Sequence, residues 1–170
     1  MASPSFEIML GRARHPLVLA LDVGSTASRG AIYDANGSPV RPRAKVPHAF
    51  TTRADGTSII DPDQIVREVT QLIDQLVDLT VGHPVAAVSL DTFASSLVGV
   101  DAQGAAVTPC FNYNDNRCAD EVALLRAEVD EDRIQALTGC RFHASYLPAS
   151  ALVVAIASTQ NAIFLIAACA

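Results

Sequence analysis

The sequence contains no tryptophan, and aromatic residues occupy only 5% of its 170 positions. It also has no run of lysine or arginine, because 12 basic residues are scattered among 18 acidic ones, for a net charge of −6. Without a basic patch, a nucleic-acid partner is not expected, although a small anion can still be held locally. Half of the residues are hydrophobic, which is typical of a soluble globular protein of one domain.

The cysteine pattern lacks metal and redox motifs. The four cysteines, at positions 110, 118, 140 and 169, show no CxxC spacing and no histidine at the distances of a zinc site. We therefore expect reduced, mostly buried thiols in a cytoplasmic protein.

The two ends of the chain differ from its middle. Residues 1–16 lack the apolar stretch of a signal peptide, since Glu7 interrupts it, and are expected to form a disordered leader. Residues 150–170 carry no charge and are long enough for a membrane span. Polar residues at 158–161 interrupt them, however, and no basic or aromatic anchors flank them. A buried helix or a non-native tail is therefore favoured over a membrane anchor.

The region between these ends, residues 17–149, begins with a strand pattern. Aliphatic runs at 17–21 and 29–33 on either side of a polar turn predict a β-hairpin. The sequence DANG at 34–37 is a second turn signal, and a third strand is expected near 44–50.

A helix is predicted next, with Asp61 as N-cap and Pro62 as the first helical residue, where a missing N–H costs nothing. Apolar residues then repeat on one helical face, at positions 65, 66, 69, 72, 73, 76 and 77. Strand patterns return from Val85 and across 96–100, and shorter helices are expected over 118–129 and 131–137, with Gly139 placed to end the second. These elements together predict an α/β domain with a mixed sheet.

The turn of the first hairpin carries residues that suit a phosphate. Gly24 lets the backbone approach a ligand, and the amides of residues 24–26 can form an anion-binding nest. Asp22 would repel a bare phosphate but suits one that arrives with Mg²⁺, and Arg29 is close in sequence. The pattern favours the phosphate tail of a nucleoside triphosphate; an ordinary polar turn, with Asp22 capping backbone amides, is the alternative.

A second polar cluster occupies residues 113–117, Tyr-Asn-Asp-Asn-Arg. Amides, a carboxylate and a guanidinium supply the donors and acceptors that a hydroxyl-rich ligand requires. The alternative is a helix start, in which Asp115 or Asn116 is only the N-cap.

Taken in order, these segments resemble the FGGY family of carbohydrate kinases. The stretch LALDVGSTASRGAIYDANG resembles the first phosphate motif of the actin-like ATPase superfamily. Residues 61–64 match the family's Asp-Pro helix start, VSLDTFASSLVGVDAQG its substrate loop, residues 113–117 its Trp-Asn-Asp-x-Arg-like segment, and TGCRFHASYLPAS its Thr-Gly…Tyr…Pro-Ala stretch. Several motifs in family order over residues 17–149 argue against chance, and DTFASSLVGVD is most similar to gluconate-kinase-type members.

The resemblance implies an incomplete RNase H-like (actin-like ATPase) domain, a mixed sheet with flanking helices that uses ATP and Mg²⁺. By the same resemblance, Asp22 would place the Mg²⁺ ion, and the ATP phosphates would face Gly24, Ser25, Thr26 and Arg29. The sugar pocket would be lined by Thr92, Phe93, Ser95, Asn114, Asp115 and Tyr146.

The resemblance also implies missing parts. The family's catalytic aspartate and its adenosine-binding second domain both lie in later segments, so no catalytic residue is assigned to this chain. We therefore expect the N-terminal part of an ATP-dependent kinase for a sugar or sugar acid, of gluconate or pentulose type, inactive as this fragment. The match gives way to the charge-free tail at residue 150, which a truncated or frameshifted reading frame would explain. Full-length relatives are expected to be homodimers.

Two alternatives stay open. One is a non-catalytic module that binds a sugar or a nucleotide without turnover. The other is a small membrane-tethered protein that uses residues 151–170 as its anchor.

Overall fold

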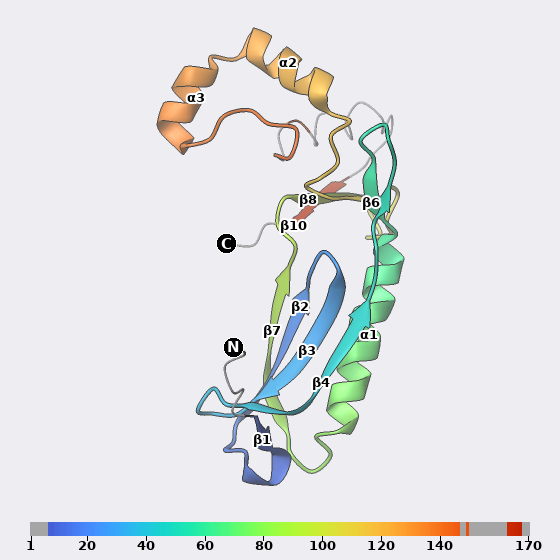
Figure 1. Ribbon diagram of the computed structural model, residues 1–170, viewed down its shortest axis with the longest axis vertical. Helices are drawn as coiled ribbons and strands as arrows, with labels where there is room; N and C mark the ends of the chain where they lie inside the picture. Colours follow the sequence, from blue (N-terminus) through green and yellow to red (C-terminus); the bar gives the residue numbers. More distant parts are fainter. Residues whose placement is uncertain (1–6, 147–148, 150–162, 168–170) are drawn as a thin grey trace. The chain divides into compact units, whose positions relative to one another are not determined.

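The computed structural model describes residues 7–146, 149 and 163–167, which fall into two compact units (Figure 1). The first unit combines residues 1–49 with 64–93, and the second combines residues 50–63 with 94–170. Each unit has a five-stranded sheet of its own. One domain with one mixed sheet is expected from the sequence, whereas the structure has two sheets in which strands distant in sequence pair with each other.

The sheet of the first unit is mixed, with the strand order β1-β4-β3-β2-β7. Strands β2 (Leu17–Val23), β3 (Ala27–Tyr33) and β4 (Pro39–Pro47) form an antiparallel meander. Strand β7 (Val85–Thr92) pairs parallel to β2, and the short β1 (Ile8–Met9) pairs parallel to β4. A meander followed by a helix and a parallel strand beside its first member is the arrangement that the RNase H-like expectation requires.

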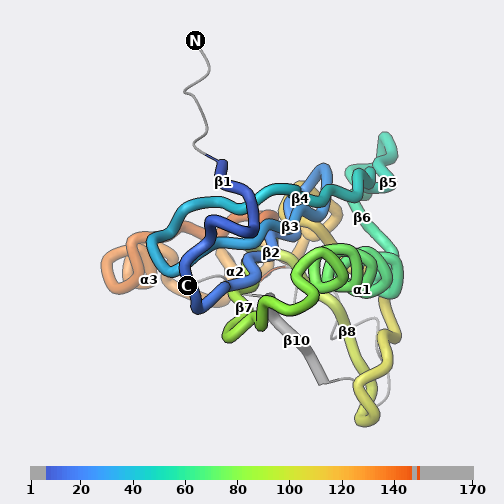
Figure 2. Tube along the Cα trace, turned by 90° about the horizontal axis from the view of Figure 1, so that it is seen from below, coloured from blue at the N-terminus to red at the C-terminus, as the bar shows by residue number. Residues whose placement is uncertain are grey.

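Helix α1 (Pro62–Asp78) lies along one face of this sheet, as Figure 2 shows. It begins as predicted, because the Asp61 carboxylate accepts the N–H of Asp63 at 2.9 Å. Its Leu72 and Leu76 side chains are fully buried in a cluster with Leu17, Leu19, Leu21, Ile32 and Val40.

The buried face of α1 is narrower than the sequence predicts. Val66 and Val77, which were assigned to that face, are 63% and 46% exposed. The face is instead centred on Glu68, Leu72 and Leu76, which follow one another at intervals of four residues.

Strand β4 starts at Pro39 and ends at Pro47, so the predicted span near 44–50 is wrong at both ends. Proline normally argues against a paired strand because it has no N–H to donate. The ladder between β3 and β4 is shifted between Gly30 and Ile32, and Pro42 falls in that irregular part. A bulge is one of the positions where a strand tolerates proline.

The predicted leader is ordered in its described part, residues 7–16, and the prediction of disorder is wrong there. Ile8 pairs with Val40 in β1, and a 3₁₀ turn, η1, follows over Leu10–Arg12. The Glu7 carboxylate forms ion pairs with Arg41 and with Arg43, the latter at 2.8 Å. A two-residue strand is too short to show a period in the sequence, which is why no element was predicted.

The sheet of the second unit is antiparallel, with the order β10-β8-β9-β6-β5. Its strands are β5 (Thr51–Thr52), β6 (Ser58–Ile60), β8 (Ser96–Val100), β9 (Cys110–Phe111) and β10 (Ile163–Ala167). The predicted strand over 96–100 is thus confirmed, and Gly104, at φ 84°, donates its N–H to Asp101 to close the turn that follows.

Strand β10 lies inside the apolar stretch 150–170, for which the sequence favours a buried helix or a non-native tail over a membrane anchor. Its five residues pair with β8, from Ile163 beside Val100 to Ala167 beside Ser96. The rest of that stretch, 150–162 and 168–170, lies outside the described residues. Among the helices that the structure does describe, none combines the length and apolar character that a bilayer crossing requires.

Helices α2 (Ala119–Glu128) and α3 (Glu131–Thr138) confirm the two predicted short helices. Gly139 ends α3 in the left-handed conformation, with φ 76°, as its position predicts. The N-cap of α2 is Cys118, so the helix does not begin at Asp115 or Asn116. A small cluster forms between α2 and the chain beyond α3, with Cys118, Val122 and Ala149 buried at its centre.

Candidate functional site

The turn between β2 and β3 holds the residues predicted for phosphate binding. The Gly24 N–H donates to the Ala27 carbonyl at 3.1 Å and closes the turn. A Cβ atom at Gly24 would lie 2.9 Å from Nη1 of Arg29 and 3.3 Å from the Ala27 oxygen. Gly24 does not have a left-handed φ, so a side chain at this position is restricted by contact with Arg29 and Ala27 rather than by backbone conformation.

Asp22 and Arg29 face each other across the mouth of this hairpin. They occupy paired positions of β2 and β3, and their side chains form an ion pair at 3.3 Å. The Asp22 side chain is 52% exposed and that of Arg29 is 44% exposed. An exposed ion pair of this kind contributes little to stability, so a phosphate or a cation can separate its members at small cost.

A second carboxylate, which the sequence analysis does not select, lies next to Asp22. Asp91 of β7 is in register with Asp22 of the parallel strand β2. Paired residues on neighbouring strands project to the same face of a sheet. One or two carboxylates together with phosphate oxygens are the usual ligands of Mg²⁺, and this pair therefore fits a Mg²⁺–nucleotide. The sequence signal that could have identified Asp91 is its position, because Asp22 and Asp91 are each the penultimate residue of an aliphatic strand.

Two further residues near the turn, His48 and Glu68, are also missed by the sequence analysis. Glu68 is buried although it is charged. It lies four residues before Leu72 on the apolar face of α1, and a charge in that position requires a partner. That spacing is the signal that identifies it; nothing in the local sequence marks His48.

The residues predicted for sugar binding divide between the two units. Thr92 and Phe93 belong to the first, where the Phe93 N–H donates to the Val23 carbonyl at 3.0 Å. The second unit holds Ser95, Asn114, Asp115 and Tyr146.

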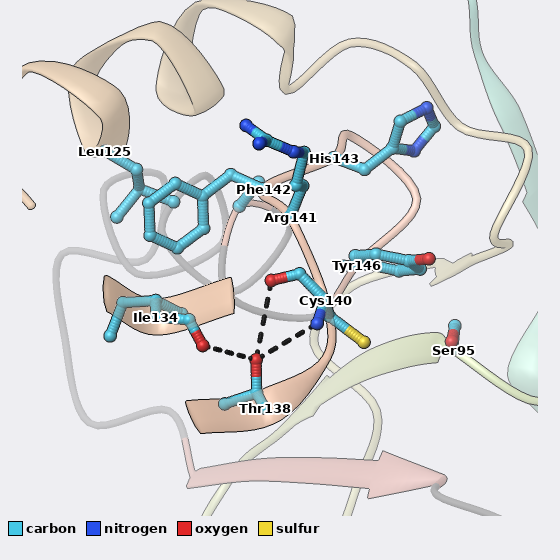
Figure 3. Close-up of a pocket in the computed structure, with 10 residues that line it drawn as sticks. Ser95, Leu125, Ile134, Thr138, Cys140, Arg141, Phe142, His143 and Tyr146 are labelled. Atoms are coloured by element: carbon cyan, nitrogen blue, oxygen red, sulfur yellow. Dashed lines mark hydrogen bonds between the residues drawn. The ribbon is translucent and has the colours of Figure 1, made fainter. Parts of the chain in front are cut away.

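Ser95 and Tyr146 line a cavity of about 430 Å³ in the second unit (Figure 3). They lie on one side of it in the figure, with Leu125 and Phe142 on the other. The remaining lining residues are Ile134, Thr138, Cys140, Arg141, His143 and Ala149. A largely apolar cavity with a few polar groups is typical of a small-molecule site.

The backbone of Ser95 supports a functional role for this loop. Its φ is 53°, and it is the only non-glycine residue with a left-handed φ in the described part of the chain. Such a conformation costs energy, and residues that adopt it gather at ligand sites.

Asn114 and Asp115 are not among the residues that line this cavity. Asn114 is exposed, whereas the Asp115 side chain is only 9% exposed. The Asp115 carboxylate accepts the Ser58 N–H at 2.9 Å and Arg117 Nη2 at 2.7 Å, with Arg117 Nε at 3.0 Å. Asp115 therefore joins the 113–117 segment to β6.

The pKa values of this pair follow from the same contacts. Burial alone would raise the pKa of Asp115, but the bonds from Arg117 and from the Ser58 amide outweigh burial and lower it below its ordinary value. The bond to Asp115 in turn raises the pKa of Arg117. Both groups are thus charged over the physiological range.

Comparisons with known proteins address the family and the fold of this chain. The N-terminal domain of the FGGY family of carbohydrate kinases matches residues 17–154. The gluconokinase of Bacillus subtilis (strain 168) is 24% identical over 129 residues, which cover 74% of this chain and 24% of that protein. The chain therefore spans about a quarter of the length of that curated relative.

Solved structures support the fold. The gluconate kinase of Lactobacillus acidophilus superposes with a TM-score of 0.78 at 22% identity, covering 88% of this chain and 31% of that one. Plasmodium falciparum glycerol kinase with ADP also gives 0.78, at 14% identity, over 94% of this chain and 32% of that one.

The fold is thus that of the actin-like sugar kinases. The chain belongs to the FGGY family of carbohydrate kinases and carries its N-terminal domain.

Proposed function

We propose that this chain forms the phosphate-binding hairpin and part of the sugar site of a carbohydrate kinase. The reaction would move the γ-phosphate of ATP to a hydroxyl of a sugar acid of the gluconate class. The observation that carries the proposal is the β2–β3 turn, where an exposed carboxylate and an exposed guanidinium flank a glycine whose Cβ would meet Arg29 and the Ala27 carbonyl. The relationship to a gluconokinase supports the substrate class.

Each residue of the hairpin has a role in this proposal. Asp22, with Asp91 beside it, would hold Mg²⁺ directly or through its waters. Ser25 and Thr26 would donate hydrogen bonds to phosphate oxygens, and Arg29 would leave Asp22 to pair with the same phosphates. Bound Mg²⁺ would neutralise phosphate charge during transfer.

The proposed sugar contacts are those that the family resemblance implies. We assign direct contacts to Thr92, Phe93, Ser95, Asn114 and Tyr146. Asp115 would act as a positioning residue, because its carboxylate is held by Ser58 and Arg117. We propose no catalytic base among the described residues, and we expect this chain to bind ligands without turnover. The cytoplasm is the proposed location, since Cys110, Cys118 and Cys140 are thiols rather than disulfides.

Titration calorimetry of the 170-residue chain tests the proposal. Mg²⁺–ATP, gluconate and xylulose would be titrated separately into the wild type and into Asp22→Asn. We expect saturable binding of Mg²⁺–ATP and of gluconate, with nucleotide affinity reduced about tenfold or more in the variant, because a contact to a charged group is worth about 1.5–3 kcal/mol.

Asp74→Asn is the matched control, since Asp74 is an exposed aspartate on α1 of the same unit. Its nucleotide affinity should equal that of the wild type. Tighter binding of xylulose than of gluconate would assign a pentulose instead. Folded wild-type protein that binds none of the three ligands would overturn the proposal.

A further inference from the structure

His48, which directly follows β4, makes contacts on both sides of the β2–β3 turn. Its backbone N–H donates to the Thr26 carbonyl at 3.1 Å. Its ring Nε2 lies 2.9 Å from the Gly24 carbonyl oxygen, and its Nδ1 lies 2.7 Å from Oε2 of Glu68 on α1. The ring is completely buried, and the Glu68 side chain is 8% exposed.

The partners of the ring determine where its protons are. The Gly24 carbonyl can only accept, so Nε2 carries a hydrogen. The Glu68 carboxylate already accepts from Ser28 Oγ at 3.1 Å and from Gln64 Nε2 at 2.9 Å. These two donors hold the carboxylate in place beside Nδ1. Glu68 thus holds the ring at Nδ1, while Nε2 donates to the turn.

Because the peptide bond is planar, the contact of His48 with the Gly24 carbonyl also fixes the direction of the Ser25 N–H. In a trans peptide the C=O of one residue and the N–H of the next point in opposite directions. Because the Gly24 C=O points at His48, the Ser25 N–H points away from it. The Gly24 N–H is already bonded to Ala27, so the Ser25 amide is a donor of the turn whose direction His48 controls.

We propose that His48 is a positioning residue for the phosphate-binding turn. Held by Glu68 and braced by Ser28 and Gln64, it fixes the Gly24 and Thr26 carbonyls and thereby aims the Ser25 amide at the phosphate. This inference rests on the proposed function for its ligand. The contacts of His48 with the turn and with Glu68, called the clamp below, do not depend on a ligand.

Two substitutions separate the contact of His48 with the Gly24 carbonyl from its contact with Glu68. His48→Gln retains an N–H near the position of Nε2 and can still reach the Gly24 carbonyl, whereas His48→Asn retains an N–H near Nδ1 and can reach only Glu68. If His48 aims the turn, Asn should weaken Mg²⁺–ATP binding about tenfold while Gln restores most of the affinity. A role limited to packing would change the stability of both variants without separating their affinities.

Amide hydrogen exchange provides a readout that needs no ligand. In His48→Asn the Gly24 amide should exchange about tenfold faster, while Leu19 and Ile32 in the paired strands stay protected. Nitrogen-15 spectra of the wild-type ring should show a proton on Nε2, the nitrogen that faces the Gly24 carbonyl. His83→Gln is the control, because it removes a ring in the same unit that contacts His15 at 3.1 Å.

The results distinguish the two proposals. If wild-type protein binds no nucleotide but the Gly24 amide responds to His48→Asn alone, the proposed function fails and the clamp stands. Unchanged Gly24 exchange in a folded His48→Asn variant, or a ring without a proton on Nε2, would overturn the clamp.

Discussion

The Asp115 carboxylate shows how a residue chosen for its chemistry can serve the framework instead. A carboxylate has about four acceptor positions. The Ser58 amide and the two nitrogens of Arg117 occupy most of them, so a sugar hydroxyl would have to displace a protein donor. The sequence identifies the residue type, but only the fold shows which donors reach it first.

We predict that Asp115→Asn lowers the free energy of unfolding by about 1–3 kcal/mol at pH 7, since it removes a charge-assisted contact to a buried group. The pKa of Asp115 is lower in the folded protein than in the unfolded chain, so its contribution is complete above about pH 4 and is lost as the pH falls through the folded value. Urea unfolding followed by circular dichroism at pH 7, 5 and 3 should show the difference between wild type and variant shrinking at pH 3.

Asp132→Asn is the comparison for this measurement. The Asp132 carboxylate is 85% exposed and pairs with Arg141 at 3.3 Å, so its loss should cost less than about 1 kcal/mol. Equal costs for the two substitutions would contradict the framework role of Asp115.

The contact between α1 and the first sheet depends on one glycine in β3. A Cβ atom at Gly30 would lie 2.5 Å from Leu76 Cδ1 and 3.3 Å from Leu21 Cδ2. Both leucines are buried in the core, so neither can move aside freely. Gly30 therefore sets how closely the helix approaches the strands.

Gly30→Ala should destabilise the protein by about 1–3 kcal/mol through overpacking. Gly11→Ala supplies the matched control, because a Cβ there meets nothing within 4 Å, and it should change stability by less than about 0.5 kcal/mol. Thermal unfolding of the two variants beside the wild type measures the difference; a Gly30→Ala protein as stable as wild type would mean that α1 can shift outward.

Elements with local signals were predicted well. The Asp61–Pro62 helix start, the Gly139 helix end and the hairpin around residues 24–26 are all confirmed. Features that depend on distant partners were not predicted. Ile60 pairs with Cys110 to form a second sheet, and Pro42 is accommodated only because the ladder with β3 is irregular.

In the candidate site, too, residues with a local sequence signal were predicted and residues that depend on distant partners were not. The β2–β3 turn was found because its residues are contiguous in sequence. The neighbours Asp91, His48 and Glu68 were not found, because they meet the turn only after the sheet and α1 have formed. Ser95 and Tyr146, which the resemblance assigns to the sugar pocket, line a common cavity, but the inward direction of Asp115 could not be read from its sequence segment.

The first unit as a whole carries an apolar edge. Strand β7 is the last strand of its sheet, and Val88 and Leu90 are 60% and 59% exposed there. They are in register with the buried Leu19 and Leu21 and so extend the core face of the sheet past the part that is covered. An exposed apolar edge strand is a site of self-association.

We predict that the wild-type chain associates at micromolar concentration and that Val88→Lys with Leu90→Lys shifts it towards monomer. Val81→Lys is the control for a mere change of net charge, because Val81 is 81% exposed but lies in the turn after α1. Sedimentation velocity over a concentration series distinguishes the variants. A wild-type chain that is monomeric at every concentration would refute the prediction.

The two units are interleaved along the chain, which passes from one to the other after residues 49, 63 and 93. During synthesis, the first unit has all of its strands and α1 once residue 93 has left the ribosome. Strands β5 and β6 are synthesised earlier, but the sheet of the second unit cannot form until β8 and β9 have also been synthesised. The first unit is therefore able to fold while the second is still being translated. A single proteolytic cut after residue 93 would leave the complete first unit on one peptide, whereas the second unit would be divided between the two products.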